Sequence, residues 1–192
     1  MVTIEDFRNQ NKDLTPYTDL QIDYLCRVLN EVKFPWECFE DGNVKIQTHP
    51  GAIGNVFVLT INDQCYMTTS PPDLLDHACL LIEASGNVLL TGLGLGVGVL
   101  LCNANRNVSS VTIIENNPVV IKHIVPMILN SCDRITPLII EADANTWCSN
   151  HMFDYGFIDH GYQKVEHDRY HTYCKQIVSW WDARCEVEAT WR

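Results

Sequence analysis

The fold is decided by residues 87–117, NVLLTGLGLGVGVLLCNANRNVSSVTIIENN. The apolar run at 88–91 predicts a strand that is buried on both faces. Four glycines follow at alternate positions: Gly92, Gly94, Gly96, Gly98. The apolar residues from Val99 onward predict a helix. A second apolar run, 111–114, predicts another buried strand that ends on Glu115. Strand, glycine loop, helix, strand and acid follow one another as in half of a nucleotide-binding unit.

Each part of this segment has a chemical reason to bind a nucleotide. Glycine allows positive φ and close approach of the backbone to a ligand, and a helix N-terminus has unpaired amide donors. A carboxylate at the end of the next strand can accept hydrogen bonds from both ribose hydroxyls, and Glu115 follows Gly92 by roughly the 20 residues that such motifs show. A glycine-rich turn alone can serve tight packing, so the prediction rests on the complete ordered set.

Composition limits the classes of protein and partner. The 192 residues are enough for one domain with a core and a small appendage. The formal net charge of −11 argues against a large nonspecific nucleic-acid footprint, which needs a basic face. The same charge attracts a small cationic substrate. We therefore expect the acceptor to be a small molecule, and the negative charge favours a cationic one. A homodimer is the one assembly that we leave open.

The cysteines and the N-terminus predict a cytoplasmic protein. None of the nine cysteines has CxxC spacing, the number is odd, and several lie in apolar runs. Free, mostly buried thiols in a reducing compartment fit this pattern better than disulfides or a zinc site. The first residues lack an apolar signal core, and no apolar run approaches the length of a membrane span.

The first third of the chain predicts a helix and a small antiparallel β element. Apolar residues recur at helical spacing over 15–33, with Thr18 as a plausible cap. Three strands follow, the last two joined by a turn at 62–64: 44–48, 56–61, 65–68. We assign residues 1–70 to this helix and β element, and 71–192 to a Rossmann-like nucleoside-binding domain.

The remaining chain alternates strands with helices. A helix at 74–84 begins after Pro71 and Pro72, and a helix from Pro118 is expected to kink or end early at Pro126. The other predicted elements are a buried strand at 135–140, a strand at 153–159, a helix at 167–181 and a last strand at 185–189. This order predicts an α/β fold with a doubly wound, mostly parallel Rossmann-like sheet, shortened after the fifth strand.

The polar residues of interest all fall where predicted strands end. Glu115, Asp143 and Asp159 each follow a strand, as the glycine loop does. In open α/β sheets, ligands bind outside the carboxyl ends of the strands, where the strand order reverses. The sequence therefore predicts that these four elements form one site.

These motifs resemble those of the class I S-adenosylmethionine-dependent methyltransferases, and within that fold the spermidine synthase branch. VLLTGLGLG (88–96) is similar to the first motif, TIIENNP (112–118) to the second, EADANTW (141–147) to the third and FDYGFIDH (153–160) to the fourth. The strand, turn, strand and helix of 56–81 resemble the small β element that precedes the nucleotide domain in spermidine synthases.

The resemblance implies S-adenosylmethionine as the cofactor. By the second and third motifs, Glu115 holds the ribose, and Asp143 with Ala144 meets the adenine. The loop residues Gly92, Leu93, Gly94 and Gly96 hold the methionine end, and Asn116 lies near the base. Simpler alternatives stay open: Asp143 can cap the following segment, and Asn116 can be a turn residue.

Asp159 and His160 are the candidate catalytic residues. Asp159 either contacts the methionine end or the acceptor, or is a satisfied turn acid. His160 titrates near neutral pH and can be a general base, although an exposed loop histidine explains it as well. His167 and His171 lie one helical turn apart, a spacing that can present two imidazoles to a metal, but they read as an exposed polar helix face and we predict no metal site.

The chain departs from the families that it resembles. Many methyltransferases have an acid where Leu90 stands, and spermidine synthases have an aspartate in the glycine loop where Leu95 stands. The run Asp-Ser-Ser-Asp of spermidine synthases, whose second aspartate is the base, is replaced by 159–162, Asp-His-Gly-Tyr. The favoured function is an S-adenosylmethionine-dependent methyltransferase with an unidentified acceptor. The alternatives are a spermidine synthase-like aminopropyltransferase and a non-catalytic descendant that binds a nucleoside or a partner.

Overall fold

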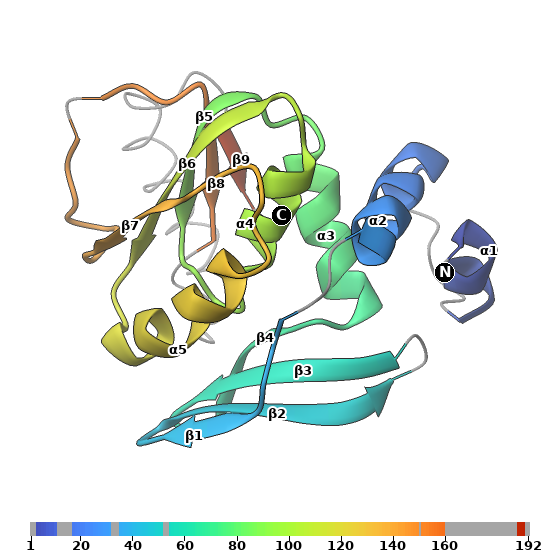
Figure 1. Cartoon of the computed structure of the whole chain (residues 1–192), viewed down its shortest axis with the longest axis horizontal. Helices are drawn as coiled ribbons and strands as arrows, with labels where there is room; N and C mark the ends of the chain where they lie inside the picture. Colours follow the sequence, from blue (N-terminus) through green and yellow to red (C-terminus); the bar gives the residue numbers. More distant parts are fainter. Residues whose placement is uncertain are drawn as a thin grey trace, which may run out of the picture.

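The chain forms two separate β-sheets. The computed structural model describes residues 3–10, 17–31, 35–51, 54–149, 151–159 and 188–190. The first sheet is antiparallel with strands in sequential order (Figure 1): β1 (Phe39–Asp41), β2 (Val44–Gly51), β3 (Gly54–Ile61), β4 (Gln64–Thr68). Asn62 and Asp63 join β3 to β4 with positive φ of 53° and 59°, as in the primed turns that match the twist of a hairpin.

The second sheet is parallel and Rossmann-like, as predicted. Its strands lie in the order β7-β6-β5-β8-β9, with these bounds: β5 (Gly86–Thr91), β6 (Val108–Glu115), β7 (Leu138–Glu141), β8 (Tyr155–Ile158), β9 (Glu188–Thr190). The chain starts at the centre with β5, runs outward to β7 and returns to the other side with β8. The order therefore reverses between β5 and β8, which is where such sheets bind ligands.

Five helices are described: α1 (Ile4–Gln10), α2 (Asp19–Glu31), α3 (Pro71–Leu81), α4 (Val97–Ala104), α5 (Pro118–Leu129). The cap predicted at Thr18 is confirmed. The amide of Gln21 donates to Thr18 Oγ1 over 3.4 Å, and the amide of Thr18 donates to Gln21 Oε1 over 2.8 Å. This reciprocal pair is a capping box, which satisfies two donors that a helix start otherwise leaves unpaired.

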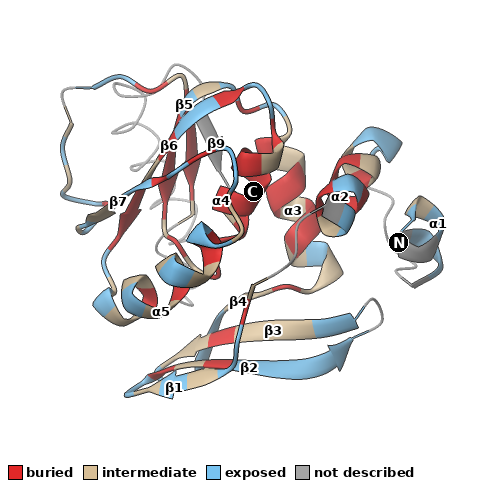
Figure 2. Cartoon of the chain, viewed as in Figure 1, coloured by how far each residue is buried: buried red, intermediate tan, exposed pale blue. Residues whose placement is uncertain are grey.

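The strands of the parallel sheet bury alternate side chains on opposite faces. On one face, Val88 and Leu90 of β5 join a large core with α3, α4 and α5, and this core continues into α2 and the small sheet through residues such as Leu25 and Leu59. On the other face, Leu89 packs in a smaller cluster that includes Ala144 and Phe153. Buried residues accordingly concentrate in β5, β6, α3 and α4 (Figure 2).

Two predictions about individual elements were wrong in part. Of the kink or early end expected at Pro126, the early end does not occur, because α5 continues to Leu129 with Ile124 and Ile128 on either side of the proline fully buried in the core. The strand predicted at 135–140 as buried is the edge strand β7, and Leu138 is 59% exposed. An edge strand has a neighbour on one side only, so its apolar residues need not be covered.

Other predictions concern covalent state, membrane contact and the C-terminal part. The seven cysteines that the structure describes are free thiols, and burial raises the pKa of Cys102 to about 12. Among the described helices, none combines the length and the apolar character that crossing a bilayer requires. The helix predicted at 167–181 lies outside the described residues, and of the strand predicted at 185–189 only β9 is described.

Candidate functional site

The glycine loop between β5 and α4 has a backbone that other residues do not readily adopt. Gly92, Gly94 and Gly96 have φ of 86°, 51° and 76°. A Cβ atom on Gly92 would lie 2.4 Å from the backbone oxygen of Asp159, and one on Gly96 would lie 2.4 Å from Cγ2 of Ile128. The glycines predicted from the sequence are therefore required by both conformation and space.

Some amides of this loop are used inside the protein and others are available. The amide of Gly92 donates to the carbonyl of Ile114 over 2.8 Å, and that of Gly96 to the carbonyl of Leu93 over 2.7 Å. Within the described part of the chain, the amides of Gly94, Val97 and Gly98 have no hydrogen-bond acceptor. These three donors at the start of α4 form a place where a helix N-terminus favours an anionic group.

Glu115 links the end of β6 to the glycine loop. Its Oε2 accepts a hydrogen bond from the amide of Leu93 over 2.8 Å, and its Oε1 accepts one from the amide of Asn117 over 2.8 Å. The residue is 8% exposed. A carboxylate has about four acceptor positions, so each oxygen keeps one for a further donor. The structure thus places Glu115, the residue predicted to bind the ribose, directly against the glycine loop.

The end of β7 lies beside Glu115, but its acid points elsewhere. The amide of Ala142 donates to the carbonyl of Glu115 over 3.0 Å. The exposed Asp143 instead accepts hydrogen bonds on Oδ1 from the amide and the side chain of Asn145, over 2.9 and 2.8 Å. This is the capping role that the sequence left open for Asp143 beside the adenine role. Ala144 is buried in the second core cluster, and Asn116 is exposed.

Asp159 lies at the end of β8, next to the first glycine of the loop. Its amide donates to Thr91 Oγ1 over 3.1 Å and to the Thr91 carbonyl over 3.2 Å. Its carboxylate oxygen Oδ2 lies 3.3 Å from Nε2 of His77, a buried side chain on α3. No motif in the sequence predicted a role for His77. Its position among the buried apolar residues of α3 was a signal, since a buried polar group requires a partner.

The small sheet and the segment before it also contact the glycine loop. Leu95 is fully buried, its amide donates to Sδ of Met67 on β4 over 3.2 Å, and its carbonyl accepts from Nε1 of Trp36 over 2.6 Å. A Cβ on Gly94 would lie 2.7 Å from the same Met67 sulfur. No pattern in the sequence predicted that Met67 and Trp36 would support the loop.

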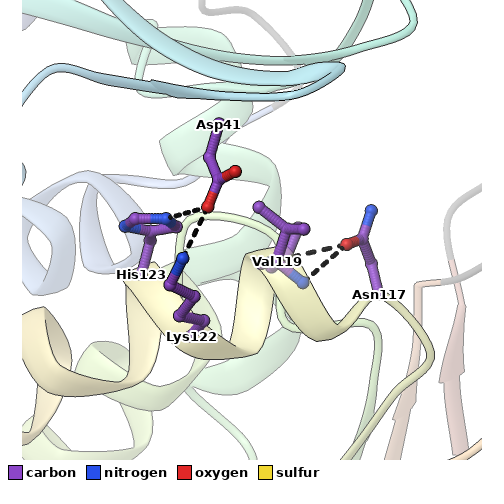
Figure 3. A network of polar contacts seen from close by, with 6 residues as sticks. Asp41, Asn117, Val119, Lys122 and His123 are labelled. Carbon is purple, nitrogen blue, oxygen red and sulfur yellow. Dashed lines mark hydrogen bonds and ion pairs between the residues drawn. The ribbon is translucent and has the colours of Figure 1, made fainter.

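A second polar contact connects the small sheet with α5 (Figure 3). Nζ of Lys122 and Nε2 of His123 both reach Oδ2 of Asp41, over 2.7 and 2.9 Å. The ring of Phe39 stacks on His123 with centroids 4.1 Å apart. At the start of the same helix, Oδ1 of Asn117 accepts from the amides of Val119 and Val120. The helix that follows Glu115 is thus fixed at both its N-terminus and its middle.

The remaining site predictions fall on residues outside the described part of the chain. These are the base candidate His160, Tyr162 beside it, and the pair His167 and His171. Of the predicted site, the structure therefore brings together the glycine loop, Glu115 and Asp159, leaves Asp143 in a turn beside them, and does not test His160.

Comparisons with known proteins extend to fold only. No family model matches the sequence, and a search of curated proteins gives no match. Among solved structures, the chain is similar to spermidine synthase from Thermotoga maritima, with 19% identity, a TM-score of 0.46 and coverage of 68% of this chain and 48% of that one. It is also similar to a spermidine synthase in complex with the transition-state analogue AdoDATO, with 17% identity, a TM-score of 0.47 and coverage of 67% and 47%.

A third similar structure is the O-methyltransferase TomG from Streptomyces achromogenes in complex with SAM, with 15% identity, a TM-score of 0.39 and coverage of 58% and 52%. The chain spans about half the length of these structures. The sheet order of the chain is itself Rossmann-like. Likenesses of this size identify no activity for this chain.

Proposed function

We propose that this chain binds S-adenosylmethionine and transfers its methyl group to a small acceptor that is not yet identified. The observation that carries the proposal is the contact between Glu115 and the glycine loop. A buried carboxylate that keeps two acceptor positions lies against a loop whose glycines let the backbone pass close to Asp159, Met67 and Ile128.

The residues present fit the parts of this cofactor. Glu115 is suited to the two ribose hydroxyls, and the available amides of Gly94, Val97 and Gly98 are suited to the carboxylate of the methionine end. When bound, the cofactor supplies a methyl group on a positively charged sulfur. The chain needs to do little covalent chemistry, because positioning the two reactants supplies most of the gain in such a displacement.

Asp159 is the group that we place between the methionine end of the cofactor and the acceptor. Its carboxylate is partly exposed at the end of β8, next to the loop. There it can accept a hydrogen bond from an amine or hydroxyl acceptor and hold it in line with the methyl group. The net charge of −11 gives the protein a negative electrostatic field, which favours a cationic acceptor.

An aminopropyltransferase is the second candidate. The observation in its favour is the small antiparallel sheet that shares a core with the Rossmann-like unit, the element that the motifs at 56–81 resemble in spermidine synthases. Against it, Leu95 occupies the loop position of the amine-binding aspartate, and its side chain is fully buried in the core. An apolar residue there gives an ammonium group no partner.

The test is calorimetric titration of the demethylated product, S-adenosylhomocysteine, into the wild type and two variants. Glu115→Ala should weaken binding about tenfold or more, since each hydrogen bond to a charged group contributes roughly 1.5–3 kcal/mol. The matched control is Glu141→Ala, because Glu141 pairs in register with Glu115 on β7 and is exposed. Equal affinity of the wild type and Glu115→Ala would reject the ribose assignment.

A further inference from the structure

Each ring nitrogen of His77 lies close to an oxygen of another residue. Nδ1 of His77 lies 2.8 Å from the backbone carbonyl of Asp73, and Nε2 lies 3.3 Å from the carboxylate of Asp159. A carbonyl and an ionised carboxylate are both acceptors, whereas a neutral imidazole has one N–H and one lone pair. The contacts therefore favour an imidazolium, which can donate from both nitrogens, beside the ionised carboxylate.

The surroundings of the ring agree with this state. Burial alone lowers the pKa of His77, but the hydrogen bond and charge of Asp159, together with Asp73, raise it above its ordinary value overall. The charged groups that shift the pKa of His77 most are Asp159 and Asp73. Neither belongs to α2, α4 or β4, which are described elements that also pack against α3. The ring of Phe157 is an apolar neighbour of His77, 5.3 Å away between centroids.

The pair also has a defined place relative to the candidate site. The carbonyl of Asp159 is the atom that would meet a Cβ on Gly92, so the aspartate forms one wall of the glycine loop. The side chain of His77 is 4% exposed and that of Asp159 is 29% exposed. The histidine is thus inside the protein, and the carboxylate is the part that a ligand can reach.

We propose that His77 is a positioning residue: its imidazolium holds Oδ2 of Asp159 so that the other carboxylate oxygen, Oδ1, faces the glycine loop and accepts a hydrogen bond from the amine at the methionine end of the ligand. This inference rests on the proposed function for the identity of the ligand, while the pair itself exists without one. Loss of the Nε2 proton removes the donor that orients the carboxylate. Binding therefore weakens as the pH rises through the pKa of His77.

The pair is tested first in the free protein. The pKa of His77 is measured by NMR titration of histidine Cε1 resonances, and His77→Gln identifies its signal by the loss of that signal. We expect a pKa above the ordinary value of about 6.5, and a lower pKa in Asp159→Asn, where the charge is gone and burial dominates. A wild-type pKa below 6.5, or one that Asp159→Asn leaves unchanged, would overturn the ion pair.

The positioning role is tested with S-adenosylhomocysteine as the probe, titrated at pH 6 and pH 9. Between these values the wild type should lose affinity by about tenfold more than His77→Gln, the size expected for a hydrogen bond to a charged group. The comparison cancels the titration of the probe's own amine. The control His123→Gln removes a histidine that pairs with an aspartate outside the site and should follow the wild type.

The two proposals fail in different ways. If the wild type and His77→Gln bind the probe with the same pH dependence, the positioning role is wrong while the proposed function stands. If the wild type does not bind the probe at all, the proposed function fails and the ligand-directed role of His77 fails with it, while the NMR result still decides whether the ion pair exists.

Discussion

Glu115 has two tasks in this structure, one of which the sequence did not predict. Its place after an apolar strand was sufficient to predict contact with a ligand, because strand ends meet at one edge of a parallel sheet. Its two oxygens also accept hydrogen bonds from the amides of Leu93 and Asn117. These hydrogen bonds depend on the path of the loop, which residue types alone do not specify. The same limit applies to Met67, which contacts the loop, and to His77, which contacts Asp159.

Because of its second task, removing the Glu115 carboxylate should affect stability as well as binding. Glu115→Ala leaves two amides without acceptors at a buried position, and each such loss costs about 1–3 kcal/mol. We expect urea denaturation to show a free energy of unfolding lower by at least about 1 kcal/mol. Glu141→Ala, one strand away, should unfold as the wild type does. Unchanged stability of Glu115→Ala would show that the two hydrogen bonds do not hold the loop.

The glycines of the loop should differ in what a substitution costs. At Gly92 a new Cβ meets a backbone oxygen at 2.4 Å, whereas at Gly94 it meets the sulfur of a flexible methionine at 2.7 Å. Both positions also require positive φ, which costs other residues roughly 1–2 kcal/mol. Gly92→Ala should therefore lower the free energy of unfolding more than Gly94→Ala, as measured by urea denaturation. The reverse order would contradict the loop geometry.

His77 predicts a pH dependence of stability with a definite sign. Its pKa is higher in the folded protein than its ordinary value, so the folded state binds the proton more tightly. The resulting stabilisation is complete below the unfolded pKa and is lost as the pH rises through the folded pKa. The difference in unfolding free energy between the wild type and His77→Gln should thus shrink from pH 6 to pH 9. A difference that grows over this range would exclude a raised pKa.

At the level of elements, periodicity and capping residues were reliable guides, while burial and helix ends were not. The hairpin turn at 62–64, the cap at Thr18 and a helix start at the two prolines of α3 all follow from residue chemistry, although α3 begins at Pro71 itself and not after Pro72. The continuation of α5 past Pro126 and the edge position of β7 follow from neighbours in space. A proline rule or an apolar run contains no information about those neighbours.

The C-terminus of α3 depends on one buried side chain. Nδ2 of Asn105 donates to the carbonyls of Leu81, Ile82 and Ala84, over 3.0, 3.3 and 2.9 Å. Asn105→Ala removes the donor that these carbonyls share, and we expect a loss of about 1–3 kcal/mol in the free energy of unfolding. The nearby exposed Asn107 is the control, since Asn107→Ala should change stability by less than about 0.5 kcal/mol. Equal effects of the two variants would show that this cap is not important.

The whole molecule is held by a core that crosses from the small sheet into the Rossmann-like unit. Leu59 of β3, Leu25 of α2 and Leu90 of β5 belong to the same buried cluster. The side chain of Trp36 hydrogen-bonds to the glycine loop itself. The sequence predicted both parts but gave no indication of this shared packing, which arises only when the parts are assembled.

Such a core should make unfolding cooperative across both sheets. We expect hydrogen exchange measured by mass spectrometry in increasing urea to expose β3 and β5 in a single transition. Leu59→Ala, which removes buried apolar volume from the small sheet, should lower the urea midpoint of both strands together. Loss of protection in β3 well before β5 would contradict a common core.

The glycine loop and Glu115 together make up the proposed site for S-adenosylmethionine. The most direct measurement is a competition titration of the wild-type protein with S-adenosylmethionine, S-adenosylhomocysteine and decarboxylated S-adenosylmethionine. The available loop amides favour a carboxylate and the buried Leu95 offers an amine no partner, so the two carboxylate-bearing compounds should bind more tightly than the decarboxylated one. A clear preference for the decarboxylated compound would support aminopropyl transfer instead. Binding of none of the three compounds would rule out a site for S-adenosylmethionine at the glycine loop and Glu115.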